Sequence, residues 1–326
     1  MSNCISAAMC CAPGNVRTNN EDAYYFNGTY TSKESMDLFA ENHNDFDIDH
    51  CLFAVCDGIG GQKDGEEASY TAVSQLRTCH DLLTTSSFNE VVGHWIQETN
   101  TNIVNTTHGG CTLAMVYIDN KGINIAHVGD SRVYCLHENN LIRLTKDHSK
   151  MQLLIDAGLL TAEEAQTHPQ RHMITRYLGM KKENGPCIPT ISRSLPLADG
   201  ERYLICTDGL TDMLSDTTIQ SIMKYSKSTK DCVKQIYTAA MDAGGRDNIT
   251  IIVFDISLDP NQSNEITRET RSKGNQHNED SLDDTISFDT TLSKQDRRYI
   301  KVVQTLTMPS TTSSNRIDIV SEVRFV

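Results

Sequence analysis

The sequence predicts an α+β fold, in which runs of strands and runs of helices pack as separate layers. Short apolar runs typical of buried strands end at turns that contain glycine and aspartate, as in residues 51–58 and 203–209. Between them, segments with a helical period alternate with segments in which every second residue is apolar. The 326 residues, 38% of them hydrophobic, suffice for one large domain with a substantial core and an appendage.

The N-terminal part predicts two strands and two helices. Residues 1–30 begin with a strand of small residues and end with a second strand at Phe26. Residues 31–49 are polar and acidic, and we expect them to form a hairpin loop. After the first Asp-Gly turn, residues 65–76 and 88–103 have the periodicity of helices.

The middle and the end of the domain are also predicted to contain both strands and helices. Residues 111–144 alternate in short runs separated by turn residues, which predicts an antiparallel meander. Residues 146–182 are expected to be helical and mobile, with an N-cap at Thr161. A strand that ends at Asp208, helices that continue to Met241 and a final strand over residues 248–254 complete the domain.

The composition changes near Asp259, which indicates a domain boundary. We expect one domain over residues 1–258 and a disordered linker over residues 259–296, which are polar and poor in large apolar groups. Residues 297–326 alternate like strands again. They are compatible with a β-hairpin on the domain or on a partner, and equally with a marginally ordered tail.

Composition and charge exclude several functions. The sequence has neither a long apolar segment nor a secretory leader, so we expect a cytoplasmic protein without membrane association, and a monomer. The formal net charge of −14 argues against a nucleic-acid partner. The eleven cysteines form no Cys-x-x-Cys pair, and we expect buried reduced thiols; a redox-sensitive Cys10-Cys11 pair is the less favoured alternative.

Aspartates stand where apolar runs end. Asp57 and Asp208 each open an Asp-Gly turn, and Asp130 follows the run that ends at Gly129. Buried carboxylates are costly unless cations balance them. Carboxylates that converge from several strand ends are typical ligands of hard divalent ions such as Mg²⁺ or Mn²⁺. The pattern therefore predicts metal-assisted chemistry.

Eight motifs, which occur in order over residues 5–255, resemble those of the metal-dependent serine/threonine protein phosphatases (PPM, type 2C), especially the bacterial branch. They are Arg17-Thr-Asn-Asn-Glu-Asp-Ala, Phe53-Ala-Val-Cys-Asp-Gly-Ile-Gly-Gly, Gly109-Gly-Cys-Thr-Leu, His127-Val-Gly-Asp-Ser-Arg-Val-Tyr, Leu144-Thr-Lys-Asp-His-Ser, Ile174-Thr-Arg-Tyr-Leu-Gly, Cys206-Thr-Asp-Gly-Leu and Gly245-Arg-Asp-Asn-Ile-Thr. One such motif would be weak evidence for the family, whereas eight motifs in the family's order are specific to it.

The resemblance implies a fold and a reaction. The fold is a four-layer α-β-β-α sandwich, with two antiparallel sheets flanked by helices and a helical flap over about residues 146–185. The reaction is the hydrolysis of phosphoserine and phosphothreonine in proteins by a metal-bridging water at a binuclear Mg²⁺ or Mn²⁺ site, with a possible third ion. The partners would be phosphorylated proteins, and the enzyme would counteract a Ser/Thr kinase.

The family pattern also assigns roles to individual residues. Asp57 would bridge two metal ions, the Gly58 carbonyl would add to one, and Asp208 and Asp247 would bind the other. Arg17 would hold the substrate phosphate, a task that suits a planar guanidinium. Arg17, Asp57 and Asp208 are thus the expected catalytic residues.

Further acidic positions have supporting roles in this reading. Glu21 and Asp22 would act on the metals through water or through the ligands themselves. Asp130, with Asp208, would hold the third ion, although a strand-end aspartate can also simply cap a turn. Asn248 would support Asp247 by hydrogen bonding. We expect structural roles for Asp212, Asp147 and His148.

The chain departs from many eukaryotic members at one position. They have histidine after the Asp-Gly, proposed there as the acid that protonates the leaving group, whereas this chain has Ile59. The sequence does not identify another proton donor. A catalytically weak member of the same fold that binds phosphoproteins is the competing hypothesis. The intact Arg17, Asp57, Asp208 and Asp247 argue against it.

Overall fold

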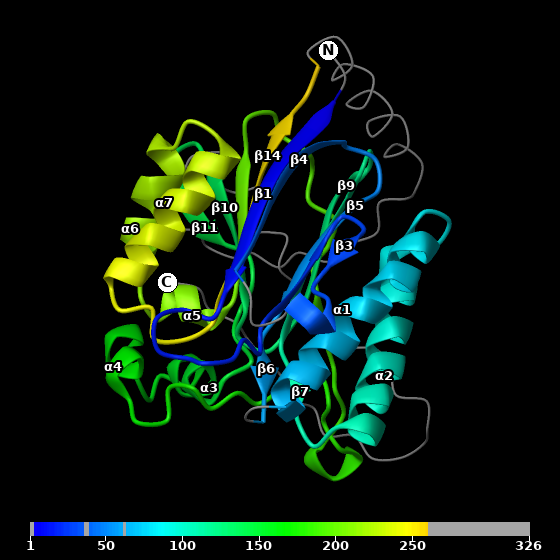
Figure 1. Ribbon diagram of the computed structural model, residues 1–326, viewed down its shortest axis with the longest axis vertical. Helices are drawn as coiled ribbons and strands as arrows, with labels where there is room; N and C mark the ends of the chain where they lie inside the picture. Colours follow the sequence, from blue (N-terminus) through cyan, green and yellow to red (C-terminus); the bar gives the residue numbers. More distant parts are fainter. Residues whose placement is uncertain (1–2, 36–38, 61–62, 260–326) are drawn as a thin grey trace, which may run out of the picture.

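The computed structural model describes residues 3–35, 39–60 and 63–259 (Figure 1). Apart from Asp259, the linker predicted over residues 259–296 and the extension over residues 297–326 lie outside the described residues. None of the helices in the described part of the chain is long and apolar enough to cross a membrane.

The first sheet has six antiparallel strands and brings both ends of the domain together. Its order is β11-β10-β13-β14-β1-β4, so the first strand pairs with the last. The strands are β1 Cys4–Ala12, β4 Ala40–Asp47, β10 Arg132–His137, β11 Asn140–Arg143, β13 Arg202–Cys206 and β14 Ile249–Ser257.

The second sheet also has six antiparallel strands, in the order β12-β9-β8-β5-β2-β3. They are β2 Ala23–Phe26, β3 Thr29–Tyr30, β5 Cys51–Cys56, β8 Leu113–Asp119, β9 Gly122–Val128 and β12 Thr190–Ile191. A two-stranded ribbon of β6 Gly58–Ile59 and β7 Gly110–Cys111 continues from β5 and leads into β8. This ribbon begins directly after Asp57.

Helices cover the outer face of each sheet (Figure 1). The pair α1 Lys63–Leu83 and α2 Phe88–Thr106 packs on the second sheet, and the pair α6 Asp216–Tyr225 and α7 Thr229–Asp242 packs on the first. Between the sheets lies a third apolar cluster, in which the Phe254 ring stacks on Phe53 at 5.3 Å and on Tyr203 at 4.9 Å. The predicted α+β fold with four α-β-β-α layers is confirmed.

Two predictions about strands were wrong. Residues 40–47 form the edge strand β4 and not a hairpin loop, because their backbone pairs with β1 although most of their side chains are exposed. Residues 111–144 do not form one meander: β8 and β9 pair in the second sheet, whereas β10 and β11 belong to the first. The chain crosses between the sheets at residues 129–131, which places Asp130 at the crossing.

The segment expected to be helical contains two short helices, α3 Lys150–Asp156 and α4 Ala162–Thr167. Thr161 caps α4 in a capping box with Glu164, as its sequence predicts. The short helix α5 Asp208–Thr211 begins at the predicted ligand Asp208 and lies near α3 and α4 at the end of the sandwich that also holds β6 and β7 (Figure 1). The remaining elements are 3₁₀ turns at Lys33–Ser35 and Lys182–Asn184.

Cysteines are distributed through the three apolar clusters as free thiols. All eleven are unpaired, and all but Cys4 are buried. Burial raises the pKa of several of them, for example that of Cys206 to about 12. The expectation that the cysteines are buried is therefore confirmed for all but Cys4.

Candidate active site

A pocket of about 170 Å³ opens where strand ends of both sheets meet. It collects side chains from segments that are far apart in the sequence. Its lining comprises Arg17, Asn19, Glu21, Asp57, Gly58, Ile59, Thr112, Asp130, His172, Ile174, Asp208, Asp247 and Asn248. The structure thus brings together every predicted site residue except Asp22.

Local structure explains how the carboxylates reach this pocket. Asp57 follows the fully buried strand β5, and Asp208 follows β13 as the first residue of α5. Asp247 stands two residues before β14, and Asp130 lies in the crossing between β9 and β10. Because the strands pair side by side, their ends deliver these residues to one edge of the sandwich.

Glycine is required at position 58 by crowding. A Cβ atom there would lie 2.4 Å from the Gly65 carbonyl oxygen and 2.6 Å from the Glu21 carbonyl oxygen. The Gly58 N–H donates to the same Glu21 oxygen at 3.1 Å. The backbone of the Asp57 turn is therefore packed directly against the Glu21 loop.

The carboxylates of the pocket repel one another. Burial, followed by the charges of Asp208 and Asp22, raises the pKa of Asp57 well above its usual range. Burial and Asp208 do the same to the pKa of Asp130, and burial with Asp212 and Asp247 raises that of Asp208. A bound cation would relieve this repulsion. The donors are oxygen atoms of carboxylates and a nearby backbone, a set that fits Mg²⁺ or Mn²⁺.

Asp22 lies behind the pocket and does not line it. Its side chain is 1% exposed, and its Oδ2 accepts hydrogen bonds from the hydroxyls of Thr207 at 2.8 Å and Thr250 at 2.7 Å. Burial raises its pKa to about 8. Asp22 therefore contacts the residue that precedes Asp208, and it can influence the pocket through that contact.

Arg17 is paired with one of the predicted ligands. Its Nη2 donates to Asp247 Oδ2 at 2.8 Å, and both side chains remain about half exposed. This hydrogen bond is the main reason that the Arg17 pKa is raised. The guanidinium is thereby held at the edge of the pocket that it lines.

Asn248 joins three segments beneath this pair. Its backbone N–H donates to Asp247 Oδ1 at 2.9 Å. Its side chain accepts from the Glu21 N–H at 2.8 Å and donates to the carbonyls of Asn19 at 2.8 Å and Pro13 at 3.1 Å. Asn248 therefore fixes Asp247 against the loop that carries Arg17 and Glu21.

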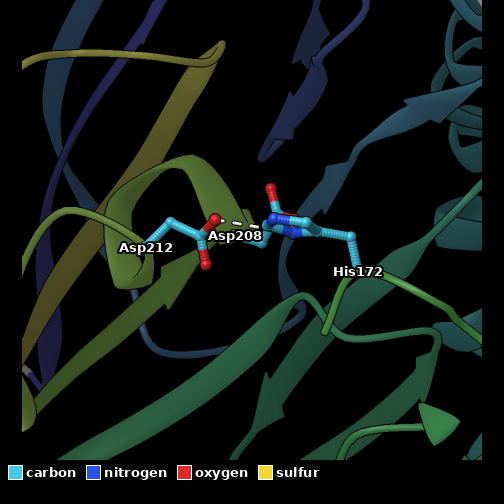
Figure 2. Close-up of side chains that lie close together, drawn as sticks. All are labelled: His172, Asp208 and Asp212. Carbon is cyan, nitrogen blue, oxygen red and sulfur yellow. Dashed lines mark ion pairs between the residues drawn. The ribbon is translucent and has the colours of Figure 1, made fainter. Parts of the chain in front are cut away.

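Several pocket residues were missed by sequence reasoning. His172 extends from the segment after α4 toward the start of α5, where its Nδ1 lies 3.5 Å from Asp212 Oδ2 and 3.9 Å from Asp208 Oδ2 (Figure 2). Asp208 and Asp212 are four residues apart across one helical turn, a spacing that could have indicated a shared face. Asn19, Thr112 and Ile174 lie inside the family motifs, but the motifs gave them no role, and His172 lies outside the motifs.

His148 and Asp147, for which the sequence predicts structural roles, lie outside the pocket lining. His148 Nδ1 accepts from the Gly129 N–H at 3.1 Å, and its ring stacks on His127 at 4.6 Å. His148 thus anchors the segment that carries His172 to the crossing that carries Asp130.

A four-layer sandwich with converging carboxylates and one arginine at its sheet ends defines a class, the metal-dependent phosphatases. The comparisons with known proteins make this specific. The family model described as protein phosphatase 2C matches residues 37–243. The chain therefore belongs to the protein phosphatase 2C family, in its bacterial branch, and is a serine/threonine protein phosphatase.

Individual relatives agree with this assignment. The chain is 30% identical over 256 residues to the serine/threonine phosphatase stp of Listeria welshimeri, covering 75% of this chain and 93% of the relative. It is 32% identical over 251 residues to the serine/threonine protein phosphatase PstP of Mycobacterium tuberculosis, and the match covers 74% of this chain and 43% of PstP. A solved structure of the PstP catalytic domain in complex with two manganese ions superimposes with a TM-score of 0.63 at 27% sequence identity. The superposition covers 78% of this chain and 99% of the PstP domain.

Proposed function

We propose that the chain hydrolyses phosphoserine and phosphothreonine in proteins at a binuclear Mg²⁺ or Mn²⁺ site in this pocket. Asp57 would bind both ions, the Gly58 carbonyl one, and Asp208 and Asp247 the other. The observation that carries the proposal is the convergence of these carboxylates with Arg17 in one pocket. Bound ions would lower the pKa of a water and neutralise charge on the phosphate.

The residues of the chain supply binding and orientation. Arg17, held by Asp247 at the rim, would bind two phosphate oxygens through its remaining N–H groups. Asp130, whose carboxylate faces Asp208 in the same pocket, would help to hold a third ion. Glu21 receives a hydrogen bond from Asn19 Nδ2 at 3.1 Å, which orients its carboxylate at the edge of the pocket.

The flap over residues 146–185 would contribute to substrate choice. His172 and Ile174 come from this segment and line the pocket, so a protein substrate at Arg17 would meet them. The exposed Leu159, at 69%, and Leu153, at 59%, offer apolar contacts on the same segment. The substrates would be phosphorylated proteins, and the enzyme would oppose a Ser/Thr kinase.

The test is Mn²⁺-stimulated release of phosphate from a phosphothreonine peptide. We expect Asp208→Ala to lower kcat/KM about a thousandfold, because several kcal/mol of transition-state stabilisation depend on the ions it holds. Arg17→Ala should mainly raise KM. The exposed Asp242→Ala and Arg77→Ala are the matched controls and should retain activity. Activity that persists in EDTA would refute the metal-dependent mechanism.

A further inference from the structure

Thr112 brackets the backbone of Asp57. Its N–H donates to the Asp57 carbonyl at 2.8 Å, and its Oγ1 accepts from the Asp57 N–H at 2.9 Å. Thr112 directly follows β7, and Asp57 directly precedes β6, the partner strand of β7. The ribbon and this side chain therefore fix the turn from which the Asp57 carboxylate extends.

The same hydroxyl reaches the crossing that carries Asp130. Thr112 Oγ1 lies 2.6 Å from Ser131 Oγ, and either hydroxyl can donate in this hydrogen bond. Both residues are 1% exposed. The Thr112 methyl packs against Gly129, where a Cβ atom would lie only 2.7 Å from Thr112 Cγ2. The Thr112 side chain thus contacts both the backbone of Asp57 and the crossing segment that carries Asp130.

A side chain without the hydroxyl cannot replace these contacts. Valine has the shape of threonine, but its second methyl cannot accept the Asp57 N–H. Non-bonded carbon atoms keep about 3.5–4.0 Å from their neighbours, so this methyl would also push Ser131 away from its 2.6 Å position. Serine keeps the hydroxyl and loses only the contact with Gly129.

We propose that Thr112 is a positioning residue whose hydroxyl, together with Ser131, sets the placement of the Asp57 carboxylate relative to that of Asp130. The proposal rests on the proposed function, because this placement matters only if the two carboxylates bind ions. Residues that orient metal ligands without touching the metal change metal affinity or activity about 10–100-fold.

The test is Mn²⁺ binding to the metal-free protein, measured by isothermal titration calorimetry. We expect Thr112→Val to weaken the affinity about 10–100-fold, Ser131→Ala to weaken it less, and Thr112→Ser to stay close to wild type. The exposed Thr101→Val is the matched control. In phosphopeptide hydrolysis the loss should appear in kcat, with KM unchanged, since Arg17 is untouched. A thermal melt of each metal-free variant separates positioning from loss of fold.

Wild-type affinity in a folded Thr112→Val would overturn the proposal. If Thr112→Val does not fold, wild-type affinity in Ser131→Ala would overturn it instead, and weaker affinity would support it. A wild-type protein that binds Mn²⁺ but releases no phosphate would refute the proposed function, and the affinities of the variants would still decide the role of Thr112. A wild type that does not bind Mn²⁺ would refute both.

Discussion

Two partly buried groups of charged side chains adjoin each other in this molecule, and they differ in what balances their carboxylates. In the first group, a single carboxylate, Asp147, accepts hydrogen bonds from Arg132 Nη2 at 2.8 Å and Nε at 3.2 Å, and from Arg143 Nη2. Burial raises the pKa of Asp147, but Arg143 and Arg132 outweigh burial and hold that pKa below its usual value. Asp147 is balanced by the chain itself.

The second group consists of Asp57, Asp130 and Asp208. The pKa of each is raised, first by burial and then by carboxylates around it. The histidine that faces Asp208 is His172, at 3.9 Å and half exposed, so its contact with Asp208 is weak and screened by solvent. The carboxylates of both groups are aspartates and all are partly buried, so the main difference between the groups lies in which charges balance them. The charge of the balanced group, Asp147, is neutralised by arginines of the fold itself, whereas the unbalanced group is suited to bind cations.

The largest expected effect concerns the balanced group. Asp147→Asn leaves Arg132 and Arg143 without their carboxylate, and breaking a buried ion pair costs about 3–5 kcal/mol of unfolding free energy. Urea unfolding in EDTA measures this loss. The exposed Asp242→Asn is the control and should unfold like wild type. An Asp147→Asn protein as stable as wild type would mean that the arginines do not depend on this carboxylate.

The opposite sign is expected in the unbalanced group. Asp57→Asn removes one charge from carboxylates that repel one another, so the metal-free protein should gain about 0.5–2 kcal/mol of unfolding free energy. In Mn²⁺, phosphate release should fall about a thousandfold, because a ligand is lost. The same urea titration and the phosphopeptide assay measure both. If Asp57→Asn were as destabilising as Asp147→Asn, the two groups would not differ as described.

The sequence predicts the aspartates of the site better than their surroundings. An apolar run that ends in Asp-Gly is a local signal, and it correctly brings Asp57 and Asp208 to strand ends that meet. The order of the family motifs, through the resemblance, also predicts the four-layer arrangement. The edge strand over residues 40–47 has no such signal, because its pairing with β1 uses only backbone groups.

The contacts of residues brought in by tertiary structure had no local signal either. Thr112 belongs to the motif Gly109-Gly-Cys-Thr-Leu, but the motif does not show what its side chain contacts, and His172 lies in a segment without periodicity. Their roles depend on where the ribbon and the flap are placed, which is set by contacts distant in the sequence. The crossing at residues 129–131 shows the same limit, because the local sequence does not indicate that β9 and β10 belong to different sheets.

A third expected effect is a pH dependence of the unfolding free energy, with opposite sign in the two regions. Next to Asp147, burial lowers the pKa of His127 to about 4 and that of its stacked neighbour His148 to about 2. An unfolded histidine has a pKa of about 6.5, so below this pH the unfolded chain binds more protons. This contribution is full above about pH 6.5 and is lost as the pH falls toward 4. The raised pKa values of Asp57, Asp130 and Asp208 act in reverse, because their contribution falls as the pH rises.

The variant His127→Gln separates the two opposing contributions to the pH dependence of the unfolding free energy. His127 Nε2 donates to the Lys146 carbonyl at 2.8 Å, and Asp147, Arg143 and Arg176 surround it. A glutamine amide can donate to the same carbonyl but takes up no proton in this range. Between about pH 6.5 and 4 the variant should therefore lose less unfolding free energy than wild type, by up to about 3 kcal/mol. Urea unfolding in EDTA across this range measures the slopes, with the exposed His43→Gln as the control. If His127→Gln and wild type had the same slope, a neutral buried His127 would be excluded, and the pH response would have to come from the carboxylates alone.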